Sequence, residues 1–187
     1  MFHDQMIVID TETGGLDPHE HSILSLGMTS WCGQYTQEFF VLEDSLTTNP
    51  RSMEINRIDL NWLRTHGRSP RDTCDHIDQF LAQLPHSSFM LAGHNISFDI
   101  AFIKRLYRLA ERPLPRALSH RSIDTHSLLW LLAQQGHIPA SACTSDGAFT
   151  YFEVEPPEEL RHTALADAVA TRELLKKILD CFRALTL

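Results

Sequence analysis

The sequence has few cysteines, and none of them forms a closely spaced pair. Its 187 residues include only Cys32, Cys74, Cys143 and Cys181, with no C-x-x-C spacing. Disulfide scaffolds and cysteine-based zinc sites are therefore excluded. Because no secretory leader precedes Met6, we expect a reducing, cytoplasmic location. A chain of this length buries about two-thirds of its unfolded surface, so any bound metal is expected to serve function rather than folding.

Long apolar runs are also missing. The longest, such as residues 128–133, are far shorter than the ~20 residues that a membrane-spanning helix needs. Linkers, internal repeats and low-complexity segments are absent as well. We therefore expect no membrane segment, and a single domain that comprises residues 1–187.

Positive charge is scarce, because 16 Lys and Arg face 24 Asp and Glu, a formal net charge of −8. Such an acidic chain is atypical of nucleic-acid-binding proteins, whose phosphate contacts usually need a basic surface. One stretch reverses the balance, since residues 104–121 contain six basic residues and a single acid, Glu111. Within it, Lys104, Arg108 and Arg112 follow helical i, i+4, i+8 spacing. They would form a basic stripe, which is either a nucleic-acid contact or a solvated helix face.

Apolar patterning and turn residues predict an α/β architecture. The expected strands are residues 6–10 with an extension to 13, then 23–31, 36–42, 88–92 and 122–124. The expected helices are 52–66, a helix capped by Ser69 with Pro70 at its first position, 98–111, 126–135 and 164–185. Residues 136–157 have no clear period and are expected to form a loop that leaves room for one short element. A three-strand meander followed by strands alternating with helices predicts a mixed sheet.

Two carboxylates end the first expected strand. Asp10 and Glu12 lie two residues apart, so both side chains point to one face, with Cα atoms about 7 Å apart. Both can then bind one hard cation. Two solvated acids are the alternative, because a D-x-E triplet arises about once by chance in a chain of this size.

A third carboxylate follows the fourth expected strand. In Gly93-His94-Asn95-Ile96-Ser97-Phe98-Asp99, a glycine-containing turn leads into a helix whose first turn contains Asp99. Open α/β sheets place their ligands at such strand ends. A carboxylate there also interacts favourably with the helix dipole, so a helix-start role is the alternative.

A histidine and a fourth carboxylate lie at the start of the last expected helix. His162 and Asp167 would lie about 140° apart if both were helical. We therefore place His162 in the segment before the helix and Asp167 on the helix, among alanines that permit close approach to the sheet. A structural or solvated histidine is the alternative.

Together these segments, I-D-T-E-T-G-G-L (9–16), G-H-N-I-S-F-D (93–99) and H-T-A-L-A-D-A (162–168), resemble the three exonuclease motifs of the DEDDh exonucleases. This DnaQ-like family includes proofreading subunits, ribonuclease T and oligoribonuclease. The resemblance extends over nearly the whole chain. It implies a ribonuclease H-like fold with a mixed five-stranded sheet flanked by helices, and 3′→5′ hydrolysis of nucleic acid that releases nucleoside 5′-monophosphates.

The resemblance also implies a metal site and a base. By the family pattern, Asp10, Glu12, Asp99 and Asp167 hold two Mg²⁺ or Mn²⁺ ions, which stabilise the attacking and leaving oxygens. The ions would neutralise the acidic cluster, so the net charge of −8 overstates the negative charge that a nucleic-acid substrate would meet. His162 would take the proton of the attacking water, a role that suits histidine because its unperturbed pKa is about 6.5.

The expected substrate contacts are Thr13, Leu16, His94, Asn95, Phe98, Arg108 and Arg112. In the resembling family, the position of Leu16 wedges against the terminal base, and a leucine that caps the core is the alternative. Phe98 is either a base-stacking or a core residue. Aromatic residues at 149, 151 and 152 form a further group that we favour for substrate contact.

Two other functions stay open, a nucleic-acid-binding domain of the same fold without turnover and a hydrolase of a small nucleotide phosphoester. The presence of all four carboxylates and His162 favours the exonuclease. Gly14 stands where the family commonly has threonine, so the choice between DNA and RNA ends stays open. Because no polymerase-tethering tail follows the last helix, we expect a free-standing enzyme for single-stranded 3′ ends. Some relatives pair as homodimers.

Overall fold

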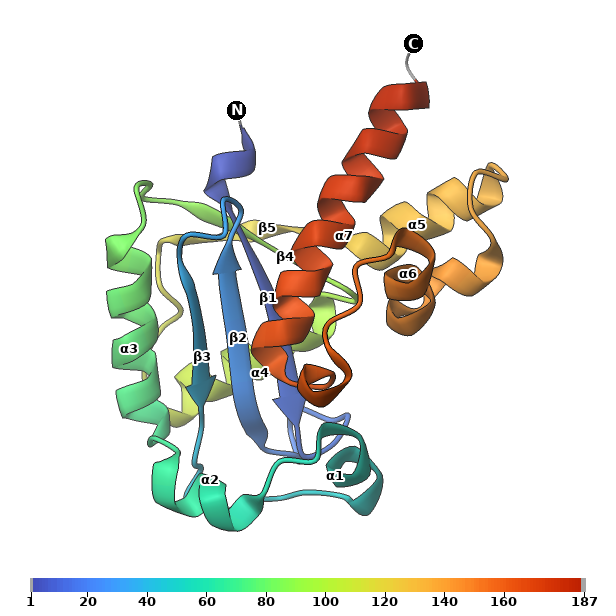
Figure 1. The fold of residues 1–187 in the computed structure, drawn as a ribbon. Helices are drawn as coiled ribbons and strands as arrows, with labels where there is room; N and C mark the ends of the chain where they lie inside the picture. The colour runs from blue at the N-terminus through green and yellow to red at the C-terminus, as the bar shows by residue number, and fades with distance from the viewer. Residues whose placement is uncertain (1, 186–187) are drawn as a thin grey trace.

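The computed structural model describes residues 2–185 and contains one five-stranded sheet (Figure 1). The strands are β1 (Met6–Thr13), β2 (Ile23–Ser30), β3 (Thr36–Phe40), β4 (Phe89–Gly93) and β5 (Leu118–Asp124). They are ordered β3-β2-β1-β4-β5, with antiparallel pairing among β1, β2 and β3 and parallel pairing of β4 with β1 and β5. The predicted mixed five-stranded sheet is confirmed.

Helices cover both faces of this sheet (Figure 1). One face packs against α3 (Pro70–Gln83) and α4 (Ser97–Leu109). The other is crossed by α7 (Ala164–Leu185), which has α5 (Thr125–Gln134) and α6 (Ser145–Phe152) beside it. None of the helices within residues 2–185 is long and apolar enough to cross a membrane.

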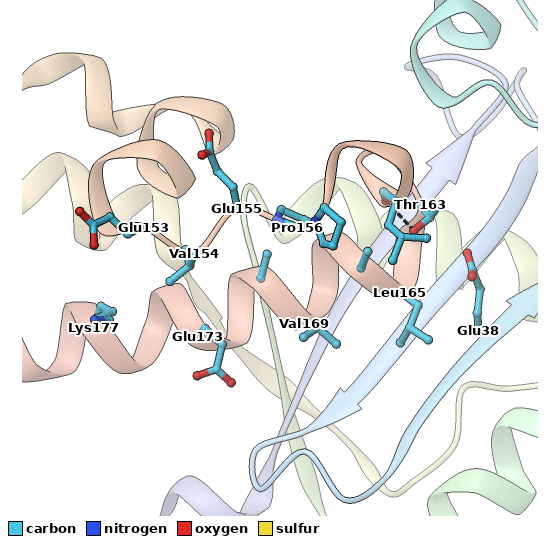
Figure 2. A pocket seen from close by; sticks show the side chains of 14 residues that line it. Glu38, Glu153, Val154, Glu155, Pro156, Thr163, Leu165, Val169, Glu173 and Lys177 are labelled. Carbon is cyan, nitrogen blue, oxygen red and sulfur yellow. Dashed lines mark hydrogen bonds between the residues drawn. The ribbon is translucent and has the colours of Figure 1, made fainter.

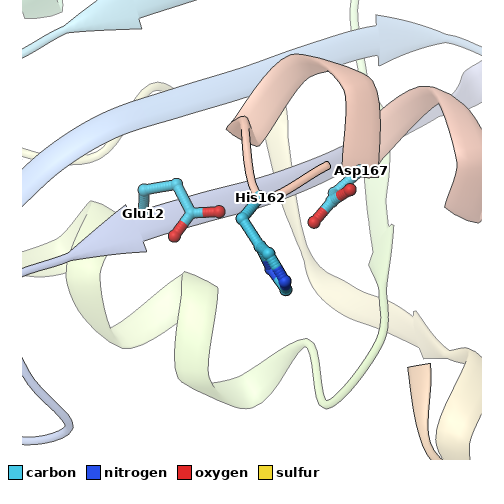
Figure 3. A group of neighbouring side chains, drawn as sticks. All are labelled: Glu12, His162 and Asp167. Carbon is cyan, nitrogen blue, oxygen red and sulfur yellow. The ribbon is translucent and has the colours of Figure 1, made fainter. Parts of the chain in front are cut away.

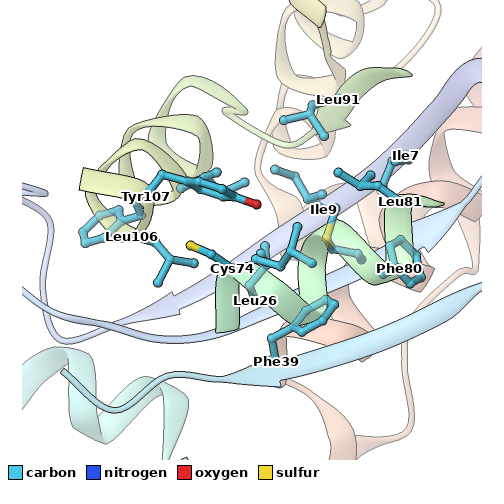
Figure 4. Close-up of a cluster of buried hydrophobic side chains, with 14 of the residues drawn as sticks. Ile7, Ile9, Leu26, Phe39, Cys74, Phe80, Leu81, Leu91, Leu106 and Tyr107 are labelled. Atoms are coloured by element: carbon cyan, nitrogen blue, oxygen red, sulfur yellow. The ribbon is translucent and has the colours of Figure 1, made fainter. Parts of the chain in front are cut away.

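The core is divided between the two faces because side chains alternate along each strand. On β1, Ile7 and Ile9 join the cluster formed with α3 and α4 (Figure 4). Met6 and Val8 point the opposite way and pack with Leu175 of α7. By the same alternation, Asp10 and Glu12 lie on the α7 face of the sheet.

Gly27 of β2 permits the close approach of α7 to this face. A Cβ atom at Gly27 would lie 2.2 Å from the backbone oxygen of Ala164, the first residue of the helix. Ala164 and Ala168 are themselves buried. The small residues therefore hold the N-terminal end of α7 against the strands that carry the carboxylates.

Residues 52–66 do not form the single helix that their pattern predicts. The chain forms α1 (Pro50–Asn56) and α2 (Leu60–His66) instead. Arg57 ends α1 with a left-handed backbone (φ 55°), and the Asp59 carboxylate caps α2 by accepting the Asn61 N–H at 2.8 Å. Two short helices with separate caps thus replace one amphipathic helix.

The segment 136–157 is more ordered than its composition predicts. It contains a 3-10 turn (Ala140–Cys143) and the two-turn helix α6, which begins where the Thr144 hydroxyl accepts the Gly147 N–H at 3.1 Å. Two further 3-10 turns lie at Phe2–Gln5 and Glu158–Leu160. The predicted cap of α3 is confirmed, since the Ser69 hydroxyl accepts the Asp72 N–H at 3.1 Å.

Candidate active site

The candidate site lies at one edge of the sheet, where β1 and β4 end and α7 begins. Because β1 and β4 are parallel neighbours, their carboxyl ends lie at the same edge. β1 contributes Asp10 and Glu12 there, and the turn after β4 leads directly into α4, whose first turn holds Asp99. The order of the strands thus brings residues 10–12 and 99 to one place.

Three side chains from separate segments meet at this edge (Figure 3). Glu12 of β1, His162 before α7 and Asp167 in the first turn of α7 each offer a ligand atom, and these atoms lie within 4.8 Å of one another. His162 has a left-handed backbone (φ 64°), a strained conformation for a residue with a side chain. Such strain persists only where surrounding contacts fix the chain, and it indicates that the placement of His162 is specified by the fold.

The carboxylates of the site stand in an environment that disfavours their charge. The pKa of Asp10 is raised well above its usual value, first by burial and then by the charges of Asp99 and Glu12. Burial likewise raises the pKa of Glu12 to about 8 and that of Asp99 to about 7. The pKa of Asp167 is also raised by burial, although the positive charge of Arg161 opposes the shift. A cation bound among these neighbouring acids would favour their charged forms and lower these pKa values.

The donor set fits a divalent metal. Asp167 Oδ1 is buried, and it has no hydrogen-bond partner among the described residues. An orphaned carboxylate oxygen next to Glu12 and His162, within a group of desolvated acids, is the arrangement expected of a cation site. Carboxylate oxygens suit Mg²⁺ or Mn²⁺ better than soft metals.

Two site contacts were not anticipated from the sequence. The Thr11 hydroxyl donates to Asp99 Oδ1 at 2.7 Å and joins β1 to α4. Arg161, which precedes His162, donates to Asp167 Oδ2 and also to Asp146 of α6. Alternation along β1 could have indicated that Thr11 faces α4, but no sequence signal pairs Arg161 with Asp146.

The loop after β1 projects Leu16 into solvent. Its side chain is 79% exposed, so Leu16 does not cap the core. The two glycines before Leu16 are required by packing, since a Cβ at Gly14 would lie 2.3 Å from the backbone oxygen of Thr47 and one at Gly15 would lie 2.1 Å from the His21 ring. Thr13 is buried and donates its hydroxyl to the Gly15 carbonyl at 2.7 Å, so it holds the same turn.

A buried ion pair between Arg105 and Glu43 fixes the loop after β1. Arg105 of α4 donates Nε and Nη2 to the two carboxylate oxygens of Glu43, at 2.9 and 2.6 Å. Its Nη1 donates to the carbonyls of Pro18 and His19 at 3.1 and 3.2 Å. Of the basic residues in the stretch 104–121, Arg105 is therefore structural, and it determines the course of the chain that carries Leu16.

The three predicted substrate contacts in the segment after β4 differ in their exposure and in their contacts. His94 is half-buried, with Nδ1 3.1 Å from the Thr125 hydroxyl, and burial lowers its pKa. Asn95 is exposed and left-handed (φ 56°), and its N–H donates to Asp124 Oδ1 at 2.9 Å. Phe98 is partly buried and packs on the α4 side of the core. Of the three, Asn95 has the most accessible side chain.

The basic stripe is interrupted in the structure. Arg108 is exposed, but Arg112 is bound by Asp75 at 2.6 Å and by Asp78 of α3. The charge of Arg112 is thus neutralised on the face of the sheet opposite α7.

The aromatic group at 149–152 is largely part of the core. Phe149 and Phe152 are buried against α5 and α7, which corrects the expectation that they contact substrate. Burial follows from the unexpected helix α6, whose inner face they form. Tyr151 alone of this group is exposed, at 47%.

A groove of about 690 Å³ runs along α7 next to the site (Figure 2). Its floor is apolar and includes Leu165 and Val169. Its rim is acidic, and the charged residues that line it are Glu38, Glu153, Glu155, Glu173 and Lys177. An acidic rim repels phosphate, so a nucleic-acid strand is not expected to follow this groove.

Comparisons with known proteins identify both a family and a fold. The family model described as Exonuclease (RNase T) matches residues 7–175. Escherichia coli exonuclease I in complex with a dT13 oligonucleotide is similar at a TM-score of 0.73 and 14% identity, with 92% of this chain covered. This chain spans only 40% of exonuclease I.

Two further solved structures have the same fold. The nuclease domain of 3′hExo, a DEDDh family member bound to rAMP, matches at a TM-score of 0.72 and 15% identity, covering 95% of this chain and 92% of that one. Cell-death related nuclease 4 matches at 0.74 and 12%, covering 95% and 64%. The ribonuclease H-like exonuclease fold is therefore confirmed.

Proposed function

The chain belongs to the exonuclease family as a nuclease of the DEDDh type, and from this premise we propose that it hydrolyses single-stranded DNA or RNA from the 3′ end. The observation that carries the proposal is the convergence of Glu12, His162 and Asp167 at the edge where Asp10 and Asp99 also lie. The products would be nucleoside 5′-monophosphates, and residues 1–187 would act as one domain.

In this proposal the four carboxylates hold two divalent cations, Mg²⁺ or Mn²⁺. The residues are Asp10, Glu12, Asp99 and Asp167. When bound, the ions polarise the scissile phosphate and stabilise the charge that develops on its oxygens. The buried Oδ1 of Asp167 supports the assignment, because no residue among those described gives it a hydrogen-bond partner.

The other side chains at the site have separate proposed roles. His162 takes the proton of the attacking water, since its ring lies with Glu12 and Asp167 at the cluster. Leu16, exposed on the fixed loop after β1, packs against the terminal base. Asn95 and the exposed Arg108 lie in the segment of the chain that follows β4. They are proposed to contact the nucleic-acid strand upstream of its 3′-terminal base.

The nature of the substrate is supported by the structural neighbours. Exonuclease I has been solved with dT13 and with dA16 oligonucleotides, and in one form with zinc. The 3′hExo domain has been solved with rAMP. We extend single-stranded binding to this chain as part of the proposal, with DNA and RNA as separate arms of its test. A reducing, cytoplasmic setting is proposed with it, in keeping with four free cysteines.

The test is a gel assay with 5′-labelled single-stranded DNA and RNA, in Mg²⁺, Mn²⁺ or EDTA. We expect a metal-dependent ladder that shortens from the 3′ end and is lost in Asp10→Ala and His162→Ala. Asp180→Asn, an exposed carboxylate near the far end of α7, is the matched control and should retain the ladder. Intact strands with folded, metal-bound protein would support a binding domain, and cleavage of mononucleotides alone would support a small-phosphoester hydrolase.

A further inference from the structure

Arg161 connects the candidate site to α6. Its guanidinium donates to Asp167 Oδ2 through Nη1 and to Asp146 through Nη2. The same group lies over the Phe149 ring, with Cζ 4.9 Å from the ring centroid. The side chain is only 18% exposed. Asp146 and Phe149 both belong to α6, so this helix fixes the guanidinium from outside the site.

The two oxygens of Asp167 have different surroundings. Oδ2 accepts the hydrogen bond from Arg161, whereas Oδ1 is buried and has no partner among the described residues. Asp167 is also one of the three residues whose ligand atoms lie within 4.8 Å of one another. A carboxylate that is held at one oxygen cannot rotate freely about its terminal bond, so the other oxygen keeps a defined direction.

We propose that Arg161 is a positioning residue, which holds Asp167 Oδ2 so that Oδ1 is presented as the ligand of a divalent cation. The inference rests on the proposed function of the site. Partners of metal-binding carboxylates orient the ligand, and their loss typically weakens metal binding by about 10–100-fold. Asp146 and Phe149 act on Asp167 only indirectly, because they hold the Arg161 guanidinium in place.

If Arg161 competed with the metal instead of orienting Asp167, its removal would have the opposite effect on metal binding. A guanidinium among acids can substitute for a missing cation, and it would then compete with the metal for Asp167. The geometry favours orientation, because Arg161 occupies only one oxygen and leaves the other free. Its charge is also shared with Asp146, which lies outside the cluster. Removal of a competitor would tighten metal binding, whereas removal of a positioning residue weakens it.

The experiment measures Mn²⁺ binding to the ion-free protein, without substrate, by the electron paramagnetic resonance signal of free Mn²⁺. We expect Arg161→Met to bind Mn²⁺ about 10–100-fold more weakly, and Asp146→Asn to weaken binding less. Arg161→Lys keeps the positive charge but lacks the planar guanidinium that donates to both carboxylates. Its Mn²⁺ affinity should lie between those of Arg161→Met and the native chain. Unchanged or tighter binding in Arg161→Met would overturn the proposal.

A matched control separates orientation from stability. Arg172 of α7 is also largely buried, and it pairs with Glu173 and donates to the Thr29 hydroxyl at 2.8 Å. Arg172→Met should lower the thermal midpoint as a lost ion pair does, with Mn²⁺ affinity unchanged. If Arg161→Met lowered only the thermal midpoint, in the way that Arg172→Met does, Arg161 would be structural alone.

Asp167→Asn distinguishes failure of this inference from failure of the proposed function. We expect it to weaken Mn²⁺ binding at least as much as Arg161→Met. If Asp167→Asn left Mn²⁺ binding unchanged, the metal site itself would be wrongly assigned. If Asp167→Asn weakened binding and Arg161→Met did not, the metal site would stand and the role of Arg161 would be wrong.

Discussion

The Thr11 hydroxyl and the Asp99 carboxylate share a buried hydrogen bond of 2.7 Å between residues 88 positions apart in the chain. This bond joins the strand that carries Asp10 and Glu12 to the helix that carries Asp99. It also stabilises the ionised form of Asp99, and so it lowers the pKa that burial raises to about 7. Thr11 therefore acts on both the position and the charge of a candidate metal ligand.

Thr11→Val is expected to raise the pKa of Asp99 further, because it removes the donor and keeps the shape. Protons would then compete better with the metal for this carboxylate. We expect Mn²⁺ binding to be weakened most near pH 6, with the difference from the native chain shrinking toward pH 8. Titrations at several pH values would show this. Thr73→Val, at a buried threonine of α3, is the control and should leave the pH dependence unchanged.

Without divalent ions, the protein is expected to lose stability as pH rises. The pKa values of Glu12 and Asp99 are about 8 and about 7 in the folded chain, against ordinary values of 4.5 and 3.8. Between these limits the folded state binds more protons than the unfolded state, so the free energy of unfolding falls as pH increases from about 4 to about 8. Urea unfolding in EDTA at pH 5 and pH 8 tests the sign.

The same series has an internal control. Asp99→Asn cannot ionise, so its ion-free stability should fall less steeply with pH than that of the native chain. Mg²⁺ should flatten the native dependence, since a bound cation offsets the charge of the acids. A native stability that rises from pH 5 to pH 8 in EDTA would contradict the burial of these carboxylates.

The sequence was sufficient to predict where the candidate-site residues lie when their position depends on local spacing. Alternation along a strand places Asp10 and Glu12 on one face, and strand-turn-helix order places Asp99 at the same edge. The contacts that support these residues were not predictable, because their partners are remote. Arg105 and Glu43 lie 62 positions apart, and Arg161 meets Asp146 only because α6 packs beside α7.

Helix prediction was incomplete where a short motif overrode composition. Residues 136–157 contain glycine, proline, serine and threonine, yet Thr144 caps a helix that buries Phe149 and Phe152. Conversely, the apolar period over 52–66 continues through a break, because Arg57 adopts a left-handed backbone that periodicity does not reveal. Both errors affected the surroundings of the site rather than its carboxylates.

His162→Gln is expected to lower kcat by about 10²–10⁴-fold, the usual contribution of a general base. Because four carboxylates remain to hold the ions, Mn²⁺ affinity should change only a few-fold. Rapid-quench measurement of a single turnover, combined with Mn²⁺ titration, separates the two effects. If Mn²⁺ binding fell as far as in Asp167→Asn, His162 would be a metal ligand rather than the base.

Leu16→Ala is expected to weaken binding of the 3′ end without affecting the fold. The side chain is 79% exposed, so its removal should change stability by less than about 0.5 kcal/mol. We expect KM for a short oligonucleotide to rise several-fold. Leu131→Ala, at an exposed leucine in the C-terminal half of α5, is the matched control and should leave KM unchanged. Equal KM values for Leu16→Ala and the native chain would remove Leu16 from the substrate site.

Arg105→Met is expected to destabilise the protein by about 3–5 kcal/mol, because it leaves the Glu43 carboxylate buried without its cation. The double variant Arg105→Met with Glu43→Gln should recover much of this loss, since both charges are then absent and the glutamine can still accept from the Ile23 N–H. Urea unfolding of the three proteins measures the difference. The double variant should nevertheless bind the 3′ end more weakly, because the carbonyls of Pro18 and His19 lose the donor that fixes the loop beneath Leu16. If the single and double variants were equally unstable, the uncompensated charge would not be the cause.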